Sequence, residues 1–324
     1  MYITVKSLCL FLSLFFMSLA HAEQINFQYE QHLLSGHYLA PLNNEPAKAV
    51  LLFVHGDGAL TYDADGYYPL IWQTLREHGY AVFSWDKPGV GQSEGNWLKQ
   101  SMIDRQSEVL SAIKVVQKKY HFTTQNTGLI GFSQAGWVLP ALATNNKVGF
   151  IIGIGFATSW LEQGQYLTKT RLKLSKASYK QLAMAMENYA KEIAFFKQAP
   201  SYADYLSFSS QAVLSPERYQ FVLTNFQANA SDDYENIDVP TLLLWGEEDL
   251  NVNASQEFNR WQSQEKNKRV TTMLIAKANH GLLNSASFNT QDFSFLQWLK
   301  LMWLGQEALA PEFLPMLLQW LDKQ

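Results

Sequence analysis

Short, continuous apolar segments recur along this chain, and segments with the spacing of amphipathic helices separate most of them. The apolar segments lie at 49–56, 80–86, 127–132, 148–157, 239–246 and 269–276. An uninterrupted apolar run is typical of a strand that is buried on both faces of a sheet. Residues 109–120 place apolar side chains at spacings of four, three and four, which indicates an amphipathic helix. Strands that alternate with helices predict an α/β fold, with a mostly parallel sheet flanked by helices.

Two segments at the ends of this pattern complete the predicted sheet and its helical layers. Residues 25–40 partly alternate between apolar and polar side chains, and Ser35-Gly36 is the turn signal within them. We therefore expect two antiparallel strands joined by a turn there. Residues 134–144 and 292–303 are expected to be helices, the second of which closes the fold.

The alternation breaks once, between Ala157 and Val239, where the sequence contains no further strand signal. Apolar residues recur there at helical spacing, namely Leu182, Met186, Tyr189, Ile193 and Phe196. This pattern predicts helices inserted late in the sheet, at about 158–238. Ligands of open α/β sheets lie at the carboxyl ends of the strands. Because the insertion follows such an end, we expect it to form a helical cap over a ligand site.

The first 22 residues have the features of a signal peptide. Lys6 provides a positive charge, an apolar run follows, and Ala20-His21-Ala22 fits a cleavage site. We expect cleavage after Ala22, which leaves one domain over residues 23–324 in an exported protein, periplasmic or secreted. An uncleaved membrane anchor is the alternative, but the run is too short to span a bilayer comfortably. The only cysteine, Cys9, would leave with the leader, so no disulfide is expected.

The sequence GFSQAG, which starts at Gly131, lies where a predicted strand gives way to a predicted helix. Small residues stand two positions before Ser133, at Gly131, and two after it, at Ala135. A sharp strand-to-helix turn requires such small residues, because larger side chains would collide with the neighbouring backbone. The turn would hold the Ser133 hydroxyl at the top of the sheet. The Gln134 N–H, at the helix N-terminus, would point into the same space.

A serine hydroxyl is a weak nucleophile until a base accepts its proton. Of the seven histidines in the chain, His280 follows the last predicted strand, so it should lie above the same edge as Ser133. An orienting carboxylate completes such a triad. Three acids follow the strand at 239–246, and we choose Asp249, with Glu248 as the alternative. The order Ser133, Asp249, His280 is the order found in α/β-hydrolases.

These residues and two further motifs resemble the serine hydrolases of the α/β-hydrolase fold, the esterase- and lipase-like superfamily, over residues 25–304. LLFVHGDG, at 51–58, resembles the family's His-Gly loop, which implies that the backbone N–H of Asp57 joins that of Gln134 in an oxyanion hole. WDKPGVGQSEG, at 85–95, resembles a glycine-rich loop of the family. Within these motifs, we assign structural rather than chemical roles to His55, Asp86, Gly89 and Gly91.

The resemblance implies an enzyme that cleaves an ester of a small acyl substrate through a serine acyl-enzyme. A thioesterase or a serine aminopeptidase would use the same triad, and a non-catalytic binding module is a more distant alternative. Haloalkane dehalogenases and epoxide hydrolases of this fold use an aspartate nucleophile, so Ser133 argues against them. The sequence contains no metal-ligand, dinucleotide or phosphate-loop motif, and we expect no cofactor and no metal. A net charge of −4 without a basic cluster argues against nucleic-acid binding.

Overall fold

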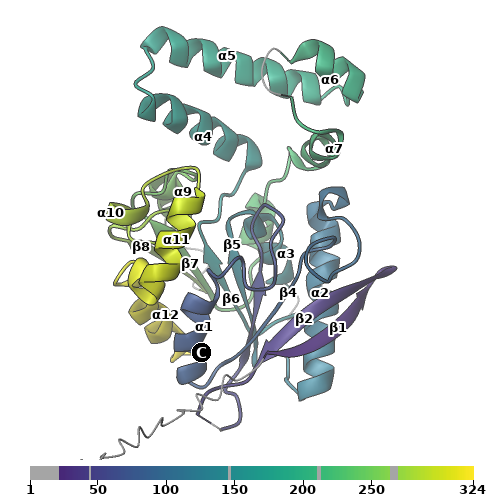
Figure 1. Ribbon diagram of the computed structural model, residues 1–324, viewed down its shortest axis with the longest axis vertical. Coiled ribbons are helices and arrows are strands. Elements are labelled where there is room, and N and C mark those ends of the chain that lie inside the picture. The colour runs from purple at the N-terminus through teal and green to yellow at the C-terminus, as the bar shows by residue number, and fades with distance from the viewer. Residues whose placement is uncertain (1–21, 44, 145–146, 210–212, 263–268) are drawn as a thin grey trace, which may run out of the picture.

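The computed structural model describes residues 22–43, 45–144, 147–209, 213–262 and 269–324 (Figure 1). The predicted leader therefore lies outside the described residues, apart from Ala22. The strands are β1 (Glu23–Tyr29), β2 (His32–Leu39), β3 (Val50–Val54), β4 (Ala81–Trp85), β5 (Thr127–Phe132), β6 (Phe150–Ile154), β7 (Thr241–Gly246) and β8 (Val270–Ile275). They form an eight-stranded sheet in the order β1-β2-β4-β3-β5-β6-β7-β8.

Helices connect the strands and flank the sheet. The α-helices are α1 (Pro69–Glu77), α2 (Met102–Tyr120), α3 (Leu139–Leu142), α4 (Trp160–Leu174), α5 (Tyr179–Phe196), α6 (Tyr202–Phe208), α7 (Pro216–Asn225), α8 (Ser231–Glu235), α9 (Ala254–Gln262), α10 (Ser285–Phe288), α11 (Phe295–Leu304) and α12 (Phe313–Leu321). Three 3₁₀ turns are η1 (Trp97–Lys99), η2 (Ser133–Trp137) and η3 (Gly305–Ala308). No helix in the described ranges combines the length and the apolar character that crossing a bilayer requires.

The sheet is mostly parallel, as the sequence predicts. Strand β2 pairs antiparallel with both β1 and β4, and the remaining neighbours pair in parallel. The predicted turn at Ser35-Gly36 is wrong, because the hairpin turns at Glu30, which has a φ of 50°, and Gly36 lies inside β2. A side chain at Gly36 would run into the ring of Phe83 on the neighbouring strand. The glycine therefore makes room for cross-strand packing.

Alternate residues of the central strands face two separate hydrophobic layers. In β3, Val50, Leu52 and Val54 pack with helices α2, α3, α8 and α9, whereas Leu51 and Phe53 pack with α1, α10, α11 and α12. All five of these strand residues are buried. Helices on both faces explain why the central strands are apolar at every position. Strand β8 differs, because it lies at the edge of the sheet and only its last residue is buried.

Two predicted helices differ in detail from the observed ones. The helix expected at 134–144 is divided into η2 and α3, which meet at Val138, just before Pro140. Proline is tolerated in the first turn of a helix but cannot continue a preceding one. The closing helix expected at 292–303 is α11, which Ser294 caps, and α12 follows it as a further helix.

Helices α4–α7, which we call the helical insertion, extend beyond the rest of the molecule in Figure 1. They lie between β6 and β7 and have a small aromatic core of their own, made by Phe196, Tyr205, Tyr219 and Phe226. The two connecting segments pair with each other through an isolated antiparallel bridge between Ser159 and Asn229. The insertion is therefore an independently packed helical layer on a narrow base.

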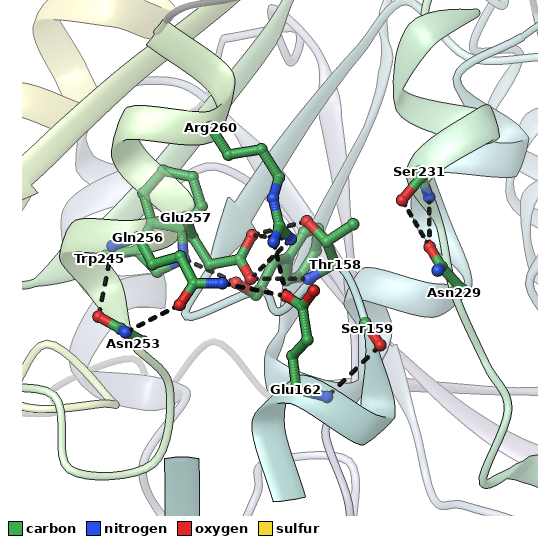
Figure 2. Close-up of polar contacts among 11 residues, drawn as sticks. Thr158, Ser159, Glu162, Asn229, Ser231, Trp245, Asn253, Gln256, Glu257 and Arg260 are labelled. Atoms are coloured by element: carbon green, nitrogen blue, oxygen red, sulfur yellow. Dashed lines mark hydrogen bonds and ion pairs between the residues drawn. The ribbon is translucent and has the colours of Figure 1, made fainter. Parts of the chain in front are cut away.

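The base of the helical insertion is held to helix α9 by a polar cluster (Figure 2). The buried carboxylate of Glu257 accepts hydrogen bonds from the hydroxyl of Thr158, at 2.6 Å, and from its backbone N–H, at 3.2 Å. Arg260 donates to Glu162 of α4 at 2.6 Å and to Glu257 at 3.3 Å. This cluster fixes the start of α4 relative to the sheet.

Candidate active site

Ser133 occupies a constrained turn directly after strand β5. Its φ is 49°, in the left-handed region that non-glycine residues rarely adopt. A Cβ placed on Gly131 would lie 2.8 Å from the Cβ of Ala135 and 2.6 Å from a methyl carbon of Leu139. Residues 131 and 135 must therefore be small, as the sequence predicts, because they pack directly against each other. Strained backbone of this kind persists where the surrounding structure imposes it, and it is common at functional sites.

His280 lies on the turn after β8 and faces the loop that follows β7. Its Nδ1 is 2.8 Å from Oδ2 of Asp249, whose side chain is fully buried. The second carboxylate oxygen, Oδ1, accepts the backbone N–H groups of Asn251 and Val252 at 2.7 and 2.8 Å. These bonds fix the carboxylate, which in turn favours the tautomer with a proton on Nδ1. The Nε2 atom is left as the proton acceptor.

Two opposing effects act on the pKa of His280. Burial disfavours the imidazolium and lowers the pKa, while the charge of Asp249 and its hydrogen bond to the ring raise it. The carboxylate prevails, and the pKa of His280 lies above its ordinary value. Glu248, the alternative acid, is exposed, and its backbone N–H bonds to Ala278. The structure thus brings Asp249, and not Glu248, to the imidazole.

Ser133 and His280 line the same cavity, which has a volume of 360 Å³. Helix α4 of the insertion contributes Gln163, Leu167 and Arg171 to its wall. The other lining residues are Asp57, Asn251, Gln291 and Asp292. Helix α4 is also bonded to the loop that carries the acid, since the Tyr166 hydroxyl donates to the carbonyl of Asp249 at 2.8 Å. The helical insertion therefore covers part of the space above the serine.

The loop after β3 passes directly beside Ser133. A Cβ on Gly56 would lie 3.4 Å from the Cβ of Ser133 and 3.2 Å from the carbonyl oxygen of Phe132. Among the described residues, the backbone N–H groups of Asp57 and Gln134 have no protein acceptor. Two unpaired donors beside a serine are what an anionic oxygen formed at that serine requires.

The carboxylate of Asp57 is turned toward the insertion. Arg218 of α7 donates to both of its oxygens, at 2.9 and 2.5 Å, and the side-chain amide of Gln134 lies 3.3 Å from Oδ1. Desolvation raises the pKa of the Asp57 carboxyl, but the hydrogen bonds and the charge of Arg218 outweigh it and hold the pKa below its ordinary value. Asp57 therefore carries a negative charge that Arg218 balances.

The residues that the sequence assigns to structural roles have partners consistent with such roles. His55 is buried, with Nε2 2.6 Å from the carbonyl oxygen of Trp85 and Nδ1 3.0 Å from the hydroxyl of Tyr68. Asp86 accepts the backbone N–H groups of Tyr62 and Gln92 at 2.7 and 2.9 Å. These bonds fasten the two loops beside the serine to each other and to the sheet.

Two buried cations near the site were not identified from the sequence. Arg105 of α2 donates to the carbonyl oxygen of His55 at 2.5 Å and to the side-chain oxygen of Gln134 at 2.7 Å. Lys87, after β4, donates to the carbonyl oxygen of Gly56 at 3.1 Å. Charged side chains are rarely buried without a partner, but their burial depends on tertiary contacts that the local sequence does not reveal.

A second cavity, of 530 Å³, adjoins the first on the side of His280. The two share Asn251, His280 and Gln291 in their walls. Much of the second cavity is lined by large apolar and aromatic side chains, which include Leu60, Tyr67, Phe293, Phe295, Trp298 and Leu301. A substrate that reaches Ser133 could extend an apolar group into this space.

Solved structures with the same fold include three proteins of low sequence identity to this chain. An esterase from Pyrococcus furiosus, Pf2001, is 15% identical with a TM-score of 0.54, over 93% of this chain and 92% of that one. Est1E from Butyrivibrio proteoclasticus, with ferulic acid bound, is 14% identical with a TM-score of 0.54, over 87% of this chain and 96% of that one. Proline iminopeptidase from Mycobacterium smegmatis is 15% identical with a TM-score of 0.54, over 80% and 92%.

The sequence itself supports the same assignment. A search among curated proteins finds no match. A family model described as serine aminopeptidase, S33, matches residues 45–286, which includes Ser133, Asp249 and His280. This match covers most of the chain and agrees with the order of strands, helices and loops described above. The chain therefore belongs to the serine aminopeptidase S33 family of hydrolases, which has the α/β-hydrolase fold.

Proposed function

We propose that this protein hydrolyses carboxylic esters through Ser133, His280 and Asp249. The observation that carries the proposal is the shared cavity, in which Ser133 lies with a histidine whose Nδ1 is bonded to a buried carboxylate. The free N–H groups of Asp57 and Gln134 provide the complementary donors. Nucleophile, base, orienting acid and oxyanion donors are the four parts that acyl transfer by a serine needs.

In the proposed reaction the Ser133 Oγ forms a bond to the acyl carbon while Nε2 of His280 accepts its proton. Asp249 stabilises the imidazolium, and the N–H groups of Asp57 and Gln134 bind the oxyanion. The carbon–oxygen bond to the alcohol then breaks, and the alcohol takes the proton from His280. Water adds to the acyl-enzyme by the same route, since its proton passes to His280, and the acid leaves as Ser133 recovers its hydrogen.

The walls of the two cavities favour an uncharged ester with an apolar group. The larger cavity presents aromatic side chains, among them Phe293 and Trp298, and has room for a group of several carbons. Apolar walls with a few polar groups are typical of sites for small organic ligands. Among the similar structures, the protein from P. furiosus is named as an esterase, and Est1E from B. proteoclasticus was solved with ferulic acid bound. This agreement supports an ester as the substrate.

Aminopeptidase activity is the second candidate, because of the family description and the likeness to proline iminopeptidase. A substrate with a free ammonium group needs an unpaired carboxylate near the serine. Asp292 lines the cavity and could serve, whereas Asp57 is paired with Arg218. Arg171 of α4, which also lines the cavity, has no charged partner among the described residues and would repel an ammonium group. Arg171 and Asp292 offset each other in this wall, so the preference for the ester rests on the apolar lining of the adjoining cavity.

A substrate screen distinguishes these candidates. The protein from residue 23 onward is assayed with p-nitrophenyl esters of increasing acyl length, with an acyl thioester and with aminoacyl anilides, beside a Ser133→Ala control. We expect labelling by a fluorophosphonate probe in the parent protein only, and the highest kcat/KM for an ester. A higher kcat/KM for the aminoacyl anilides would replace the esterase by a peptidase. Absence of labelling in the folded parent protein would refute the serine mechanism.

We further propose that the helical insertion acts as a cap that selects the substrate, and that the protein is exported. Contacts of Gln163, Leu167 and Arg171 with the cavity support the first point. The charged and apolar parts of the leader, followed by Ala20-His21-Ala22, support the second. An exported esterase would act in the periplasm or outside the cell.

A further inference from the structure

We propose that Lys87 is a positioning residue that orients and polarises the oxyanion donor of Asp57. This inference rests on the proposed function, because it assigns a role in the same acyl-transfer site. Lys87 touches neither the cavity nor the triad. It acts on the peptide group that joins Gly56 to Asp57, and it does so from the interior of the protein.

The geometry of that peptide group carries the argument. The ammonium of Lys87 donates to the carbonyl oxygen of Gly56 at 3.1 Å. The N–H on the same peptide group is that of Asp57, which has no protein acceptor in the described ranges. A trans peptide is planar, and its C=O and N–H point in opposite directions. A donor that fixes the carbonyl on the interior side therefore fixes the N–H on the opposite side.

The same hydrogen bond strengthens the N–H as a donor. A hydrogen-bond donor on the carbonyl oxygen draws electron density along the peptide group, and hydrogen bonds in series polarise one another in a site of low dielectric. The developing oxyanion would be at the far end of this series, beyond the Asp57 N–H. Lys87 thus strengthens the donor that would bind the oxyanion without contacting the oxyanion itself, and this effect needs no rearrangement during the reaction.

The surroundings of Lys87 indicate that this residue has a specific role at its buried position. The residue is 2% exposed, and its burial, together with the charge of Arg105, lowers the pKa of the Lys87 amine well below its ordinary value. The side-chain nitrogen donates to the carbonyl oxygen of Gly56, and the ring of Trp97 lies 4.3 Å from Nζ. It has no carboxylate in salt-bridge contact in the described residues. A methionine would fill this position without the cost of burying a charge.

Neighbouring cations provide the comparison that isolates this contact. Arg105 holds the preceding carbonyl, that of His55, whose peptide group does not carry the proposed donor. Arg218 lies 5.6 Å from the centroid of the Trp97 ring and bonds to the side chain of Asp57. Of these three basic residues, Lys87 is the one bonded to the peptide group that carries the Asp57 N–H.

The test compares Lys87→Met, which keeps an unbranched apolar chain but removes the donor, with Lys87→Gln, which keeps a neutral donor. The matched control is the double variant Arg218→Met with Asp57→Asn, because it removes a cation near the same tryptophan without leaving the Asp57 carboxylate unbalanced, and the peptide contact stays in place. For each folded variant, kcat and KM are measured on an ester, together with the rate of fluorophosphonate labelling. Labelling forms the Ser133 oxygen–phosphorus bond, releases fluoride and uses the same oxyanion donors.

We expect Lys87→Met to lower kcat by roughly 10- to 100-fold, less than the full loss of a donor, with KM changed by no more than about twofold because the bond strengthens in the transition state. Lys87→Gln should recover part of the loss, and the labelling rate should fall in parallel with kcat. The double variant of Arg218 and Asp57 should retain a larger share of kcat than Lys87→Met.

Several results would overturn the proposal. One is a folded Lys87→Met variant with a kcat within about twofold of the parent. Another is an equal loss in Lys87→Met and in the double variant of Arg218 and Asp57, which would indicate a general effect of charge or packing. If Lys87→Met does not fold, the test rests on Lys87→Gln. A folded Lys87→Gln variant with a raised KM and an unchanged kcat would refute the positioning role of Lys87. A failure of the proposed function is distinguishable from a failure of this inference, because in that case the fluorophosphonate does not label the parent protein.

Discussion

Arg218, in helix α7 of the insertion, forms a two-fold hydrogen-bonded ion pair with Asp57, on the loop after β3. The two residues lie 161 positions apart in the chain. The pair links the helical insertion to the loop whose backbone N–H is the proposed oxyanion donor. It also explains how an acidic residue is tolerated beside a developing negative charge, because its carboxylate points toward the arginine and its charge is balanced there.

This arrangement predicts that the side chain of Asp57 matters less than its backbone. Asp57→Asn and Asp57→Ala keep the N–H, so kcat should fall by roughly tenfold or less. Asp57→Pro removes the N–H and should cost about 10²- to 10³-fold in kcat, in addition to any distortion of the loop. Steady-state kinetics on an ester, with circular dichroism as the check on folding, measure both. Equal losses in folded Ala and Pro variants would assign the chemistry to the carboxylate.

A second prediction concerns the triad. Ser133→Ala, His280→Ala and Asp249→Asn should each lower kcat by several orders of magnitude, about 10⁴-fold or more, while the far-UV spectrum stays unchanged. The losses should not add in the double variants, because the three residues act as one unit. Glu248→Gln is the matched control, since Glu248 adjoins Asp249 in sequence but does not contact the imidazole. Near-normal turnover in Asp249→Asn would show that another group orients the histidine.

The central strands β3 to β7 were predictable from sequence because they are buried at every position and therefore mostly apolar. The turn at Ser133 was predictable for a related reason, since Gly131 and Ala135 must pack against each other. Ser35-Gly36 misled the prediction, because a glycine that makes room for Phe83 has the same sequence signature as a glycine in a turn.

The remaining features depend on contacts between distant parts of the chain. Three consecutive acids follow β7, and only the path of that loop brings Asp249 to His280. The local sequence around Arg218 does not indicate that it pairs with Asp57. Likewise, the glycine-rich loop around Lys87 does not indicate that this side chain bonds to Gly56. Residue types and spacing identify the local turn, but ion pairs across the site follow from the packing of the insertion on the sheet.

A third prediction follows from the raised pKa of His280. Neutral imidazole is the working base, so kcat/KM should rise with pH as His280 loses its proton. Because the charge of Asp249 outweighs the effect of burial, the apparent pKa should lie above the ordinary value of about 6.5. A pH–rate profile between about pH 5 and 9 on a neutral ester measures it. A midpoint below about 6 would mean that desolvation prevails at this site, and a flat profile would exclude histidine as the limiting base.

A fourth prediction concerns the leader. When the full chain is produced in a Gram-negative host, the exported protein should begin at Glu23, because cleavage is expected after Ala22. Intact-mass measurement and N-terminal sequencing of the periplasmic fraction and the medium test this directly. A Lys6→Glu variant, which reverses the charge ahead of the apolar run, should reduce export. Retention of Cys9 in the exported protein would contradict cleavage at this site.

The last prediction concerns Glu257, at the base of the helical insertion. Burial raises the pKa of its carboxyl, and the hydrogen bonds from Thr158 and the charge of Arg260 offset this only in part. A carboxyl whose pKa is higher in the folded protein binds its proton more tightly there. Its contribution to the free energy of unfolding is therefore lost above the folded pKa and gained as the pH falls toward the unfolded value of about 4.3.

Glu257→Gln has no such titration, so the stability of the parent protein relative to this variant should increase as the pH is lowered from 7 toward about 4.5. Glu257→Ala should be less stable than Glu257→Gln at every pH, by about 1–3 kcal/mol, because the hydroxyl and N–H of Thr158 lose their acceptor. Urea denaturation at several pH values measures the differences, and titrations common to all three proteins cancel. Parallel stability curves for the parent and Glu257→Gln would show that the carboxyl titrates alike in both states, and that burial does not govern it.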